Sequence, residues 1–415
     1  MKTLSILGST GSIGTSTLDV VARHPGRYRV HALTAHSSVD TLLGQIATFR
    51  PALAVLSDPA AARQLEARLP AGSDTQVRAG EAGLIEAVQA PGVEQVVAGI
   101  VGAAGLRPVH AALLAGKDVA LANKEVMVLA GELMMGVARE HGARVLPVDS
   151  EHNALFQCMQ GNNLDQVEQL ILTASGGPFR DLPLEEFPQI TRAQTLRHPN
   201  WSMGQKITVD SATMMNKGLE VIEARWLFDL PPEQIGVLVH RQSIVHALVT
   251  YRDGSVIAQL GLPDMRTPIA HCLAYPERLP LDLPRLNLAE TARLEFAEVE
   301  ADRYPCYFLA LEALRLGGGL PAALNGADEV VVAAYLEDAF SFTQIAAILE
   351  EVMNLLRGQL ASGEAPAFLR EVTSVEDAIL ADAFGRELAT EQIRQAEERS
   401  SGALAGNLMH ARGNS

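Results

Sequence analysis

The first 149 residues alternate short apolar runs with stretches of helical pattern. The apolar runs have the length of buried strands and lie at Leu4–Leu7, Arg29–Leu33, Ala54–Leu56, Glu94–Ala98, Asp118–Leu121 and Arg144–Val148. Helical or mixed patterning fills the intervals at Thr15–Arg23, Val39–Phe49, Pro59–Leu69, Gly80–Val88, Gly105–Ala115 and Lys124–Glu140. This alternation predicts an α/β domain over residues 1–149, built on a Rossmann-like doubly wound parallel sheet.

The pattern changes after residue 149. Residues 150–275 combine candidate strands with a helix, at Gln169–Thr173, Val237–Val239, Val256–Gln259 and Lys217–Phe228, which predicts a central α+β catalytic domain. Three prolines, Pro276, Pro280 and Pro284, indicate a linker over 276–300. Helical periodicity then predicts a C-terminal helical bundle over 301–398, with helices at Pro305–Leu316, Ala322–Leu336, Phe342–Asn354 and Ser374–Ala396. The polar residues 399–415 are predicted to be a disordered tail.

Composition and charge narrow the classes of partner. The chain has 415 residues, of which 48% are hydrophobic and 20% charged, as in a globular protein of several domains. Its formal net charge of −16 argues against nucleic acid or an anionic membrane surface as the main partner. A small anionic substrate stays possible, provided that local cationic groups or a metal offset the general negative field.

Cysteine usage and the N-terminus suggest the compartment. Cys158, Cys272 and Cys306 are far apart and show no CxxC spacing, so neither a disulfide framework nor a thiolate zinc site is indicated. The first apolar run begins at Leu4, which leaves no room for a signal peptide, and no apolar run reaches membrane-spanning length. We therefore expect a cytoplasmic protein without a membrane partner.

A glycine-containing turn follows the first predicted strand. The segment Gly8-Ser9-Thr10-Gly11-Ser12-Ile13-Gly14 opens the first helix with G-x-x-G-x-x-G spacing in place of the usual G-x-G-x-x-G. Amides at a helix N-terminus, together with the Thr10 and Ser12 hydroxyls, can bind a phosphate. We favour dinucleotide binding here over a merely structural turn.

The end of the second predicted strand bears on the choice of dinucleotide. It reads Thr34-Ala35-His36-Ser37-Ser38, without the acid that usually holds the ribose hydroxyls of NAD. This favours NADP, with Ser37 and Ser38 as candidate partners of its 2′-phosphate. Asp40 keeps the alternative open, because a carboxylate that reached the ribose would favour NAD.

Acidic and basic residues cluster where the later predicted strands end. Asp149 and Glu151 are two residues apart, so in an extended chain both side chains would project to one side and could hold a hard cation. A lone Asp-x-Glu is more commonly a solvated acidic turn. Asn123-Lys124-Glu125 follows Asp118–Leu121 at the edge where such sheets bind ligands. An asparagine N-cap is the alternative there.

Two further segments could bind an anion. Asn216, Lys217 and Glu220 share one face of a predicted helix, although a plain surface Lys–Glu pair is an equally simple interpretation. Ser175-Gly176-Gly177 ends a strand in a layout that can present backbone amides to a phosphate, but a plain turn is the default. Residues 176–204, a long segment with His198 and Trp201, are typical of a lid, unless Trp201 belongs to a core.

Seven segments together resemble the 1-deoxy-D-xylulose 5-phosphate reductoisomerase family. They are Gly8–Gly14, Leu121–Glu125, Pro147–Asn153, Ser175–Phe179, His198–Gly204, Val209–Glu220 and Pro263–Pro268. The match runs in order from residue 1 to nearly 395, and several of the motifs are long and uncommon. Residues 36–38 depart from the family's common Gly-Lys-Asn, and the segment Ala322–Glu329 departs from its Asn- and Ala-rich version.

The resemblance implies roles for individual residues. The ligands of Mg2+ or Mn2+ would be Asp149, Glu151 and Glu220. Substrate would contact Lys124, Ser150, Glu151, Ser175, His198, Trp201, Ser211, Asn216, Lys217 and Glu220, with Ser175, Ser211, Asn216 and Lys217 around its phosphate. The catalytic residues would be Lys124, Glu151 and His198. NADPH would contact Thr10, Gly11, Ser12, Ile13, Asn123, Glu125 and Gly204, while Met203, Ser243 and Met265 match further pocket positions.

The reaction that the resemblance implies is the conversion of 1-deoxy-D-xylulose 5-phosphate to 2-C-methyl-D-erythritol 4-phosphate, in isoprenoid precursor synthesis, by a homodimer. Two rival hypotheses remain. Another metal-assisted NADP oxidoreductase, such as a hydroxy-acid dehydrogenase, would fit the nucleotide motif and the acids, but the Ser, Asn and Lys group favours a phosphorylated substrate. A non-enzymatic NADP sensor would leave the three acids unexplained.

Overall fold

The structure, a computed structural model, describes residues 1–197 and 204–412. The chain divides into two compact units, each assembled from separate segments. The first unit contains Met1–Thr173, Glu223–Gly236 and Ser243–Leu294. The second contains Ala174–Ile222, Val237–Gln242 and Glu295–Ser415. These two units differ from the domains predicted from the sequence, and the predicted domain boundaries stay predictions.

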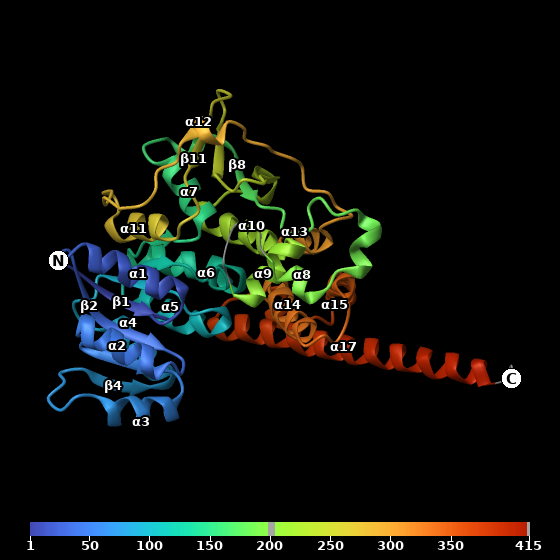
Figure 1. Cartoon of the computed structure of the whole chain (residues 1–415), viewed down its shortest axis with the longest axis horizontal. Helices are drawn as coiled ribbons and strands as arrows, with labels where there is room; N and C mark the ends of the chain where they lie inside the picture. Colours follow the sequence, from blue (N-terminus) through green and yellow to red (C-terminus); the bar gives the residue numbers. More distant parts are fainter. Residues whose placement is uncertain (198–203, 413–415) are drawn as a thin grey trace. The chain divides into compact units, whose positions relative to one another are not determined.

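The first unit is built on a parallel sheet of seven strands in the order β4-β3-β2-β1-β5-β6-β7 (Figure 1). The strands are β1 (Lys2–Leu7), β2 (Tyr28–Ala35), β3 (Leu53–Leu56), β4 (Gln76–Ala79), β5 (Gln95–Ala98), β6 (Asp118–Leu121) and β7 (Val145–Pro147). The helices between them are α1 (Ser12–Arg23), α2 (Val39–Phe49), α3 (Pro59–Arg68), α4 (Gly80–Gln89), η1 (Gly102–Gly105), α5 (Leu106–Leu114) and α6 (Glu125–His141). The predicted doubly wound sheet is confirmed.

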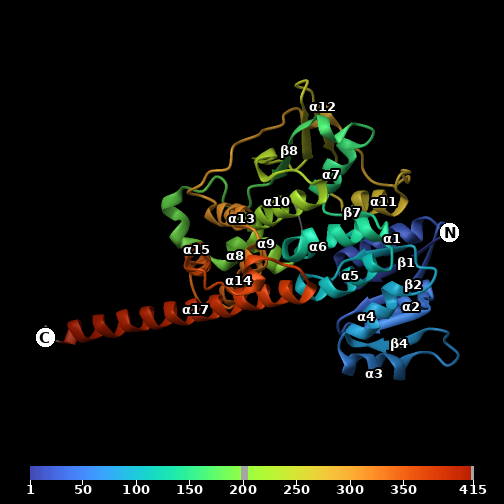
Figure 2. The same cartoon turned by 180° about the vertical axis from the view of Figure 1, so that it is seen from behind.

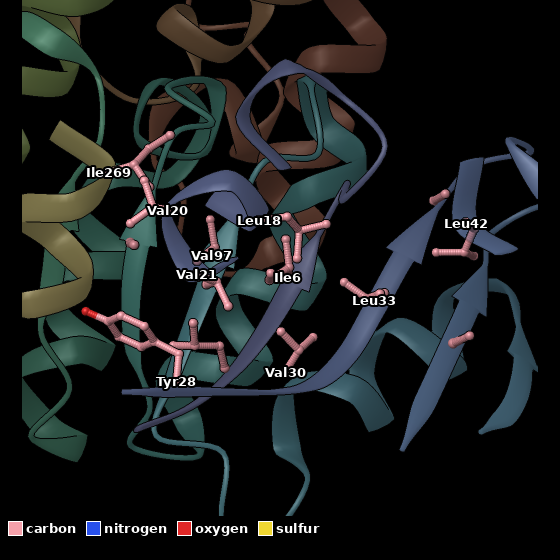
Figure 3. Packing of buried hydrophobic residues seen from close by; sticks show 14 of the residues in the cluster. Ile6, Leu18, Val20, Val21, Tyr28, Val30, Leu33, Leu42, Val97 and Ile269 are labelled. Atoms are coloured by element: carbon pink, nitrogen blue, oxygen red, sulfur yellow. The ribbon is translucent and has the colours of Figure 1, made fainter. Parts of the chain in front are cut away.

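Aliphatic side chains fill the space between this sheet and its helices. Leu18 and Val21 of α1 lie over Ile6 and Val97 of the sheet (Figure 3), and helix α11 (Arg266–Ala274) adds side chains to the same cluster. Burial of each such side chain contributes about 1.5–3 kcal/mol relative to leaving it exposed. The core therefore fixes the strand ends that carry the candidate site.

A smaller sheet of four strands has the order β11-β10-β8-β9. Its strands are β8 (Val167–Ala174), β9 (Ile235–Val239), β10 (Val245–Tyr251) and β11 (Val256–Leu260), and β10 runs antiparallel to both β8 and β11. Helix α7 (Ser150–Met159) packs on β10 and β11. The predicted α+β region is thus present, although neither β10 nor α7 was predicted.

Helices make up most of the second unit. They are η3 (Leu184–Gln189), α8 (Arg192–Thr195), α9 (Gln205–Thr213), the first part of α10 (Met215–Phe228), α13 (Pro305–Leu316), α14 (Leu320–Leu336), α15 (Phe342–Ser362), α16 (Ala367–Arg370) and α17 (Val375–Arg412). Figure 2 shows α17 alongside α14, and the two helices approach closely because a Cβ at Gly385 would lie 1.8 Å from the Ala323 oxygen. The predicted helical C-terminal region is confirmed.

Two segments outside this framework were also predicted. The region 276–300 contains only the short helix α12 (Leu288–Thr291) and a single bridge between Val239 and Ala297. In contrast, the prediction of disorder from residue 399 differs from the structure, because α17 continues to Arg412. The segment carries Ala, Leu and Met, which favour helix, and it has no proline. Every helix within the described residues is too short or too polar to cross a membrane.

Candidate functional site

The glycine turn lies at the point where the strand order reverses. Strand β1 has β2 on one side and β5 on the other, and ligands of such sheets bind beyond the strand ends at this point. Gly8 has φ +74°, and a Cβ there would lie 2.6 Å from the Gly99 oxygen. A Cβ at Gly14 would lie 2.3 Å from Ser9 Cα. Only glycine therefore allows this close packing of turn and helix.

The start of α1 can receive a phosphate. Gly11 is its N-cap, and no side chain caps the first turn, so its amide groups are not bonded to a cap. The predicted cofactor residues of the turn are all exposed or half-buried; they are Thr10, Gly11, Ser12 and Ile13. The backbone and hydroxyl groups present thus fit the pyrophosphate of a dinucleotide.

The loop after β2 carries the residues considered for the 2′-phosphate. The side chains of His36, Ser37 and Ser38 are exposed there, and His36 Nδ1 lies 2.7 Å from Ser57 Oγ. Asp40, the residue that kept NAD open, lies within α2 and pairs with Arg68 at 2.6 Å. The Asp40 carboxylate therefore already has a cationic partner.

Asn123 connects the loops that follow β5 and β6. Its buried side-chain amide donates to the carbonyl oxygen of Gly102 at 2.9 Å and also to that of Ile100. The alternative of an asparagine N-cap is wrong, because the N-cap of α6 is Lys124 and its first turn has no side-chain cap. Glu125, the first residue of α6, is buried as well.

Lys124 and Asp149 form an ion pair just beyond β6 and β7. Lys124 Nζ lies 2.5 Å from Asp149 Oδ2, and the two side chains are only 9% and 16% exposed. Beneath them, the buried Cys272 thiol of α11 donates to the Pro147 oxygen at 3.0 Å. A charge pair so shielded from water is costly to break, because each charge loses a close counter-charge where water screens little.

The extended geometry assumed for Asp149 and Glu151 is wrong. The chain leaves β7 at Pro147, Asp149 is the N-cap of α7, and Glu151 lies in the first turn of that helix. Carboxylates are favoured at this end of a helix by its dipole, which explains the acids locally without an extended segment. The Ser150 hydroxyl donates to Glu151.

Asp149 belongs to a group of three side chains that could hold a metal ion. Asp149, His152 and Glu223 each offer one ligand atom, and these atoms all lie within 4.8 Å of one another. His152 and Glu223 are fully buried, and His152 Nδ1 lies 3.5 Å from Glu223 Oε2. The His152 ring stacks on Phe228, which fixes its orientation. Oxygen-rich donors of this kind suit a divalent cation.

His152 and Glu223 were missed in the sequence. A signal was present, since His152 follows Asp149 by three residues and Glu223 follows Glu220 by three, the spacing that places side chains on one helix face. Glu223 is held in place because the same part of α10 packs on α6: a Cβ at Gly131 would lie 2.1 Å from the Trp226 ring.

In the second unit, three predicted residues meet near the start of α10. Asn216 Nδ2 donates to Glu220 Oε1 at 2.5 Å, and Lys217 Nζ pairs with Glu220 Oε2. The three side chains share one helix face, as their spacing predicts. The side chains of Lys217 and Glu220 are almost completely buried, so they do not form the solvated surface pair that was the alternative interpretation.

The turn after β8 brings two predicted serines into neighbouring segments. Gly177 N donates to Ser175 Oγ at 3.1 Å, and a Cβ at Gly177 would lie 2.8 Å from the Ser211 oxygen. The Tyr304 hydroxyl donates to the Gly176 oxygen at 2.8 Å and holds the turn. Ser175 therefore lies beside the end of α9, where Ser211 is found.

The remaining predicted positions are distributed as follows. His198, Trp201 and Met203 lie outside the described residues. Gly204 is the N-cap of α9 in the second unit. Ser243 is buried with φ +52°, and Met265 is the N-cap of α11, both in the first unit.

The fold and the site together define a class of protein. A doubly wound sheet with a glycine turn at its switch point, next to a lysine and metal-type carboxylates at the strand ends, is the architecture of an NADP-dependent oxidoreductase. Three family models match the chain. They are 1-deoxy-D-xylulose 5-phosphate reductoisomerase over residues 4–131, the C-terminal domain of that enzyme over 145–228, and the DXP reductoisomerase C-terminal domain over 260–388.

Full-length relatives agree with these matches. The 1-deoxy-D-xylulose 5-phosphate reductoisomerase of Burkholderia multivorans is 52% identical over 401 residues, covering 96% of this chain and 98% of the relative. That of Trichlorobacter lovleyi is 50% identical and covers 94% and 97%. The chain belongs to the 1-deoxy-D-xylulose 5-phosphate reductoisomerase family.

Solved structures give the same result. A DOX-P reductoisomerase in complex with NADPH, fosmidomycin and magnesium superposes with a TM-score of 0.90 at 45% identity, covering 96% of this chain and 99% of the other. The Zymomonas mobilis enzyme in complex with NADPH has a TM-score of 0.87 at 43% identity, covering 94% and 99%.

Proposed function

We propose that this protein rearranges and reduces 1-deoxy-D-xylulose 5-phosphate to 2-C-methyl-D-erythritol 4-phosphate with NADPH and a divalent cation. The observation that carries the proposal is the full-length relationship, with 52% identity over 96% of the chain to a relative of that name. In the reaction one carbon–carbon bond breaks and another forms. The resulting carbonyl then takes a hydride, two electrons with one hydrogen, from NADPH at carbon and a proton from solvent at oxygen, which leaves NADP+.

The cofactor site would use the glycine turn and the neighbouring strand ends. The first-turn amides of α1, with the hydroxyls of Thr10 and Ser12, would bind the pyrophosphate. Ser37 and Ser38, exposed at the end of β2, would contact the 2′-phosphate. Gly11, Ile13, Asn123, Glu125 and Gly204 would complete the cofactor contacts.

The metal site would use Asp149, Glu151 and Glu220, with Mg2+ or Mn2+ as the ion. Support comes from the donor chemistry, because carboxylate oxygens suit hard cations. Lys124, 2.5 Å from Asp149, offsets part of the negative charge that gathers there. When bound, the cation would supply a Lewis acid to the substrate, and NADPH would supply the hydride.

The phosphate of the substrate would lie near the start of α10. Ser175, Ser211, Asn216 and Lys217 supply hydroxyl, amide and ammonium donors there. Because Lys217 is almost completely buried, its charge would act on a bound phosphate with little screening. Binding energy from this non-reacting group can be used to orient the reacting carbons.

The catalytic residues would be Lys124, Glu151 and His198. Lys124 Nζ and the Ser150 hydroxyl would hydrogen-bond the substrate oxygens and hold them in place for rearrangement. His198 and Trp201, in the 176–204 flap, would close over the substrate and exclude water, which protects a reactive carbonyl. These flap roles rest on the family relationship.

The assembly and compartment follow as finer proposals. A homodimer is supported by β11, an edge strand whose Val256 and Ile257 are 54% and 39% exposed, because an apolar sheet edge is a ready pairing surface. Cytoplasmic location is supported by the three buried free thiols, as expected in a reducing compartment.

One assay tests the function. Purified protein is mixed with 1-deoxy-D-xylulose 5-phosphate and NADPH, with and without Mg2+ or Mn2+, while NADPH oxidation and the product are followed. We expect metal-dependent oxidation and a branched tetrol phosphate. Oxidation with 2-hydroxy acids or 2-keto acids instead would favour the dehydrogenase hypothesis, and NADPH binding without turnover would favour the sensor.

A further inference from the structure

Two buried carboxylates in the second unit bond to one lysine. Lys206 and Asp210 lie one turn apart on α9, and Asp328 lies on α14. Lys206 Nζ lies 2.6 Å from Asp210 Oδ2 and 2.8 Å from Asp328 Oδ2. The carboxylate side chains are 3% and 1% exposed, whereas Lys206 is 27% exposed.

The charges of this trio do not balance if both acids are ionised. One ammonium would then face two carboxylates, leaving a net negative charge in a place from which water is excluded. Burial first, and the charge of Asp328 second, raise the pKa of Asp210 well above its usual value. The second oxygens, Asp210 Oδ1 and Asp328 Oδ1, are buried and accept no hydrogen bond from the described residues. The two carboxyl groups lie within hydrogen-bonding reach of each other, so one proton held between them would reduce their repulsion.

Among the residues that the structure describes, the titratable groups on the neighbouring helices do not supply the missing charge. From α13, the Cys306 thiol faces both acids, and burial raises its pKa so far that it is neutral. From α8, Arg192 pairs with Asp338 at 3.1 Å. On α14 itself, Glu329 pairs with Arg386 of α17 at 2.5 Å. The neighbouring charges are thus compensated by their own partners.

We propose that Asp210 and Asp328 share one proton and, with Lys206, clamp the end of α9 in the position that the phosphate pocket requires. The proposal rests on the proposed function, because Ser211 directly follows Asp210 and contributes to that pocket. The Ser211 oxygen also adjoins the Gly177 turn, so a shift of α9 would disturb both serines of the pocket. The three clamp residues are positioning residues and do not touch the substrate.

The clamp should make the affinity for substrate fall as pH rises. A raised carboxyl pKa means that the folded protein holds the proton where the unfolded chain has lost it, so stability falls as pH rises through the folded value. Above that pH, the two carboxylates repel and α9 separates from α14. The KM for 1-deoxy-D-xylulose 5-phosphate should then rise by up to about tenfold per pH unit, with a smaller change in kcat.

The test compares pH profiles of the full-length protein and its variants. Asp210→Asn keeps the shape of the side chain and replaces the carboxyl that holds the proton with a neutral amide, so we expect near-wild-type KM at neutral pH and loss of the alkaline rise. Asp328→Asn also leaves a single carboxyl group beside Lys206 and should remove the rise as well. Glu329→Gln, a change at the adjacent acid of α14, serves as the control and should keep the wild-type profile. Thermal unfolding across the same pH range reports the clamp without turnover.

Outcomes separate the clamp from the proposed function. If the wild-type protein does not consume 1-deoxy-D-xylulose 5-phosphate, the proposed function fails, while the stability profiles still test the shared proton. If the wild type is active but Asp210→Asn keeps its alkaline rise in KM, the clamp is refuted. A folded but inactive Asp210→Asn protein would also refute it, because the amide should replace the protonated acid.

Discussion

Replacement of Lys124 with methionine removes the cationic partner of Asp149. Because the pair is 9% and 16% exposed, the variant removes a counter-charge from Asp149 at a place where water screens little, and breaking pairs of this kind costs about 3–5 kcal/mol. Unfolding entropy is about 2 cal/mol/K per residue, so for the 415 residues the unfolding entropy of the whole chain is roughly 0.9 kcal/mol/K. The melting temperature without metal should therefore fall by roughly 3–6 °C.

The same variant should respond more strongly to Mg2+ than the wild type does. A cation held by Asp149 would replace the lost ammonium as counter-charge, so the ion should restore part of the stability. Differential scanning calorimetry with Mg2+ and with a chelator measures both effects, and activity should stay low because Lys124 is a proposed catalytic residue.

An exposed ion pair in the same unit gives the matched control. Arg68 lies 2.6 Å from Asp40, close to the 2.5 Å between Lys124 and Asp149, but the two side chains are 50% and 86% exposed. Arg68→Met should cost no more than about 1 kcal/mol and should leave the Mg2+ response unchanged. Equal losses in the two variants, or a Lys124→Met protein that gains nothing extra from Mg2+, would refute the reasoning.

Three further outcomes are expected. Glu220→Gln should weaken Mg2+ binding by more than tenfold in calorimetric titration, because it removes one of the three proposed anionic ligands; an unchanged titration would exclude it from the metal site. Lys217→Ala should raise KM for 1-deoxy-D-xylulose 5-phosphate and lower kcat, and wild-type kinetics would contradict the phosphate pocket. Burial lowers the pKa of His271 to about 4. Its neutral form therefore contributes stability that is complete above pH 6.5 and is lost as pH falls toward 4. His271→Gln should reduce the loss of unfolding free energy at acid pH by up to about 3 kcal/mol in denaturant titrations.

Hydrophobic patterning predicted the large sheet well because central parallel strands are apolar on both faces. Leu53–Leu56, for example, is buried throughout, and the helix Val39–Phe49 has the predicted bounds. The edge strand Gln76–Ala79 was missed because it is half exposed and therefore lacks an apolar run. Hydrophobic patterning identifies strands whose side chains are buried in the core. It does not identify an edge strand that is held mainly by backbone hydrogen bonds.

The site was predicted less evenly. Residue types in known motifs indicated Asp149 and Lys124, but their ion pair joins separate strand ends, and such a contact depends on the fold. The local geometry assumed for Glu151 was wrong because an N-cap acid and an extended acid look alike in sequence. His152 and Glu223 were missed because their contact joins residues far apart in the chain, and local spacing alone does not predict such a contact.

The reaction rates of the three buried thiols with a thiol reagent can report local opening of the protein. A thiol reagent can reach Cys272, which lies under the strand end that carries Asp149, only when the first unit opens around it. Cys306, in the second unit, is sealed in the same way beside the Asp210 and Asp328 carboxylates. Labelling rates of these two residues therefore time the opening of each unit separately, without any engineered label. A ligand that binds only one unit should slow one rate and leave the other unchanged.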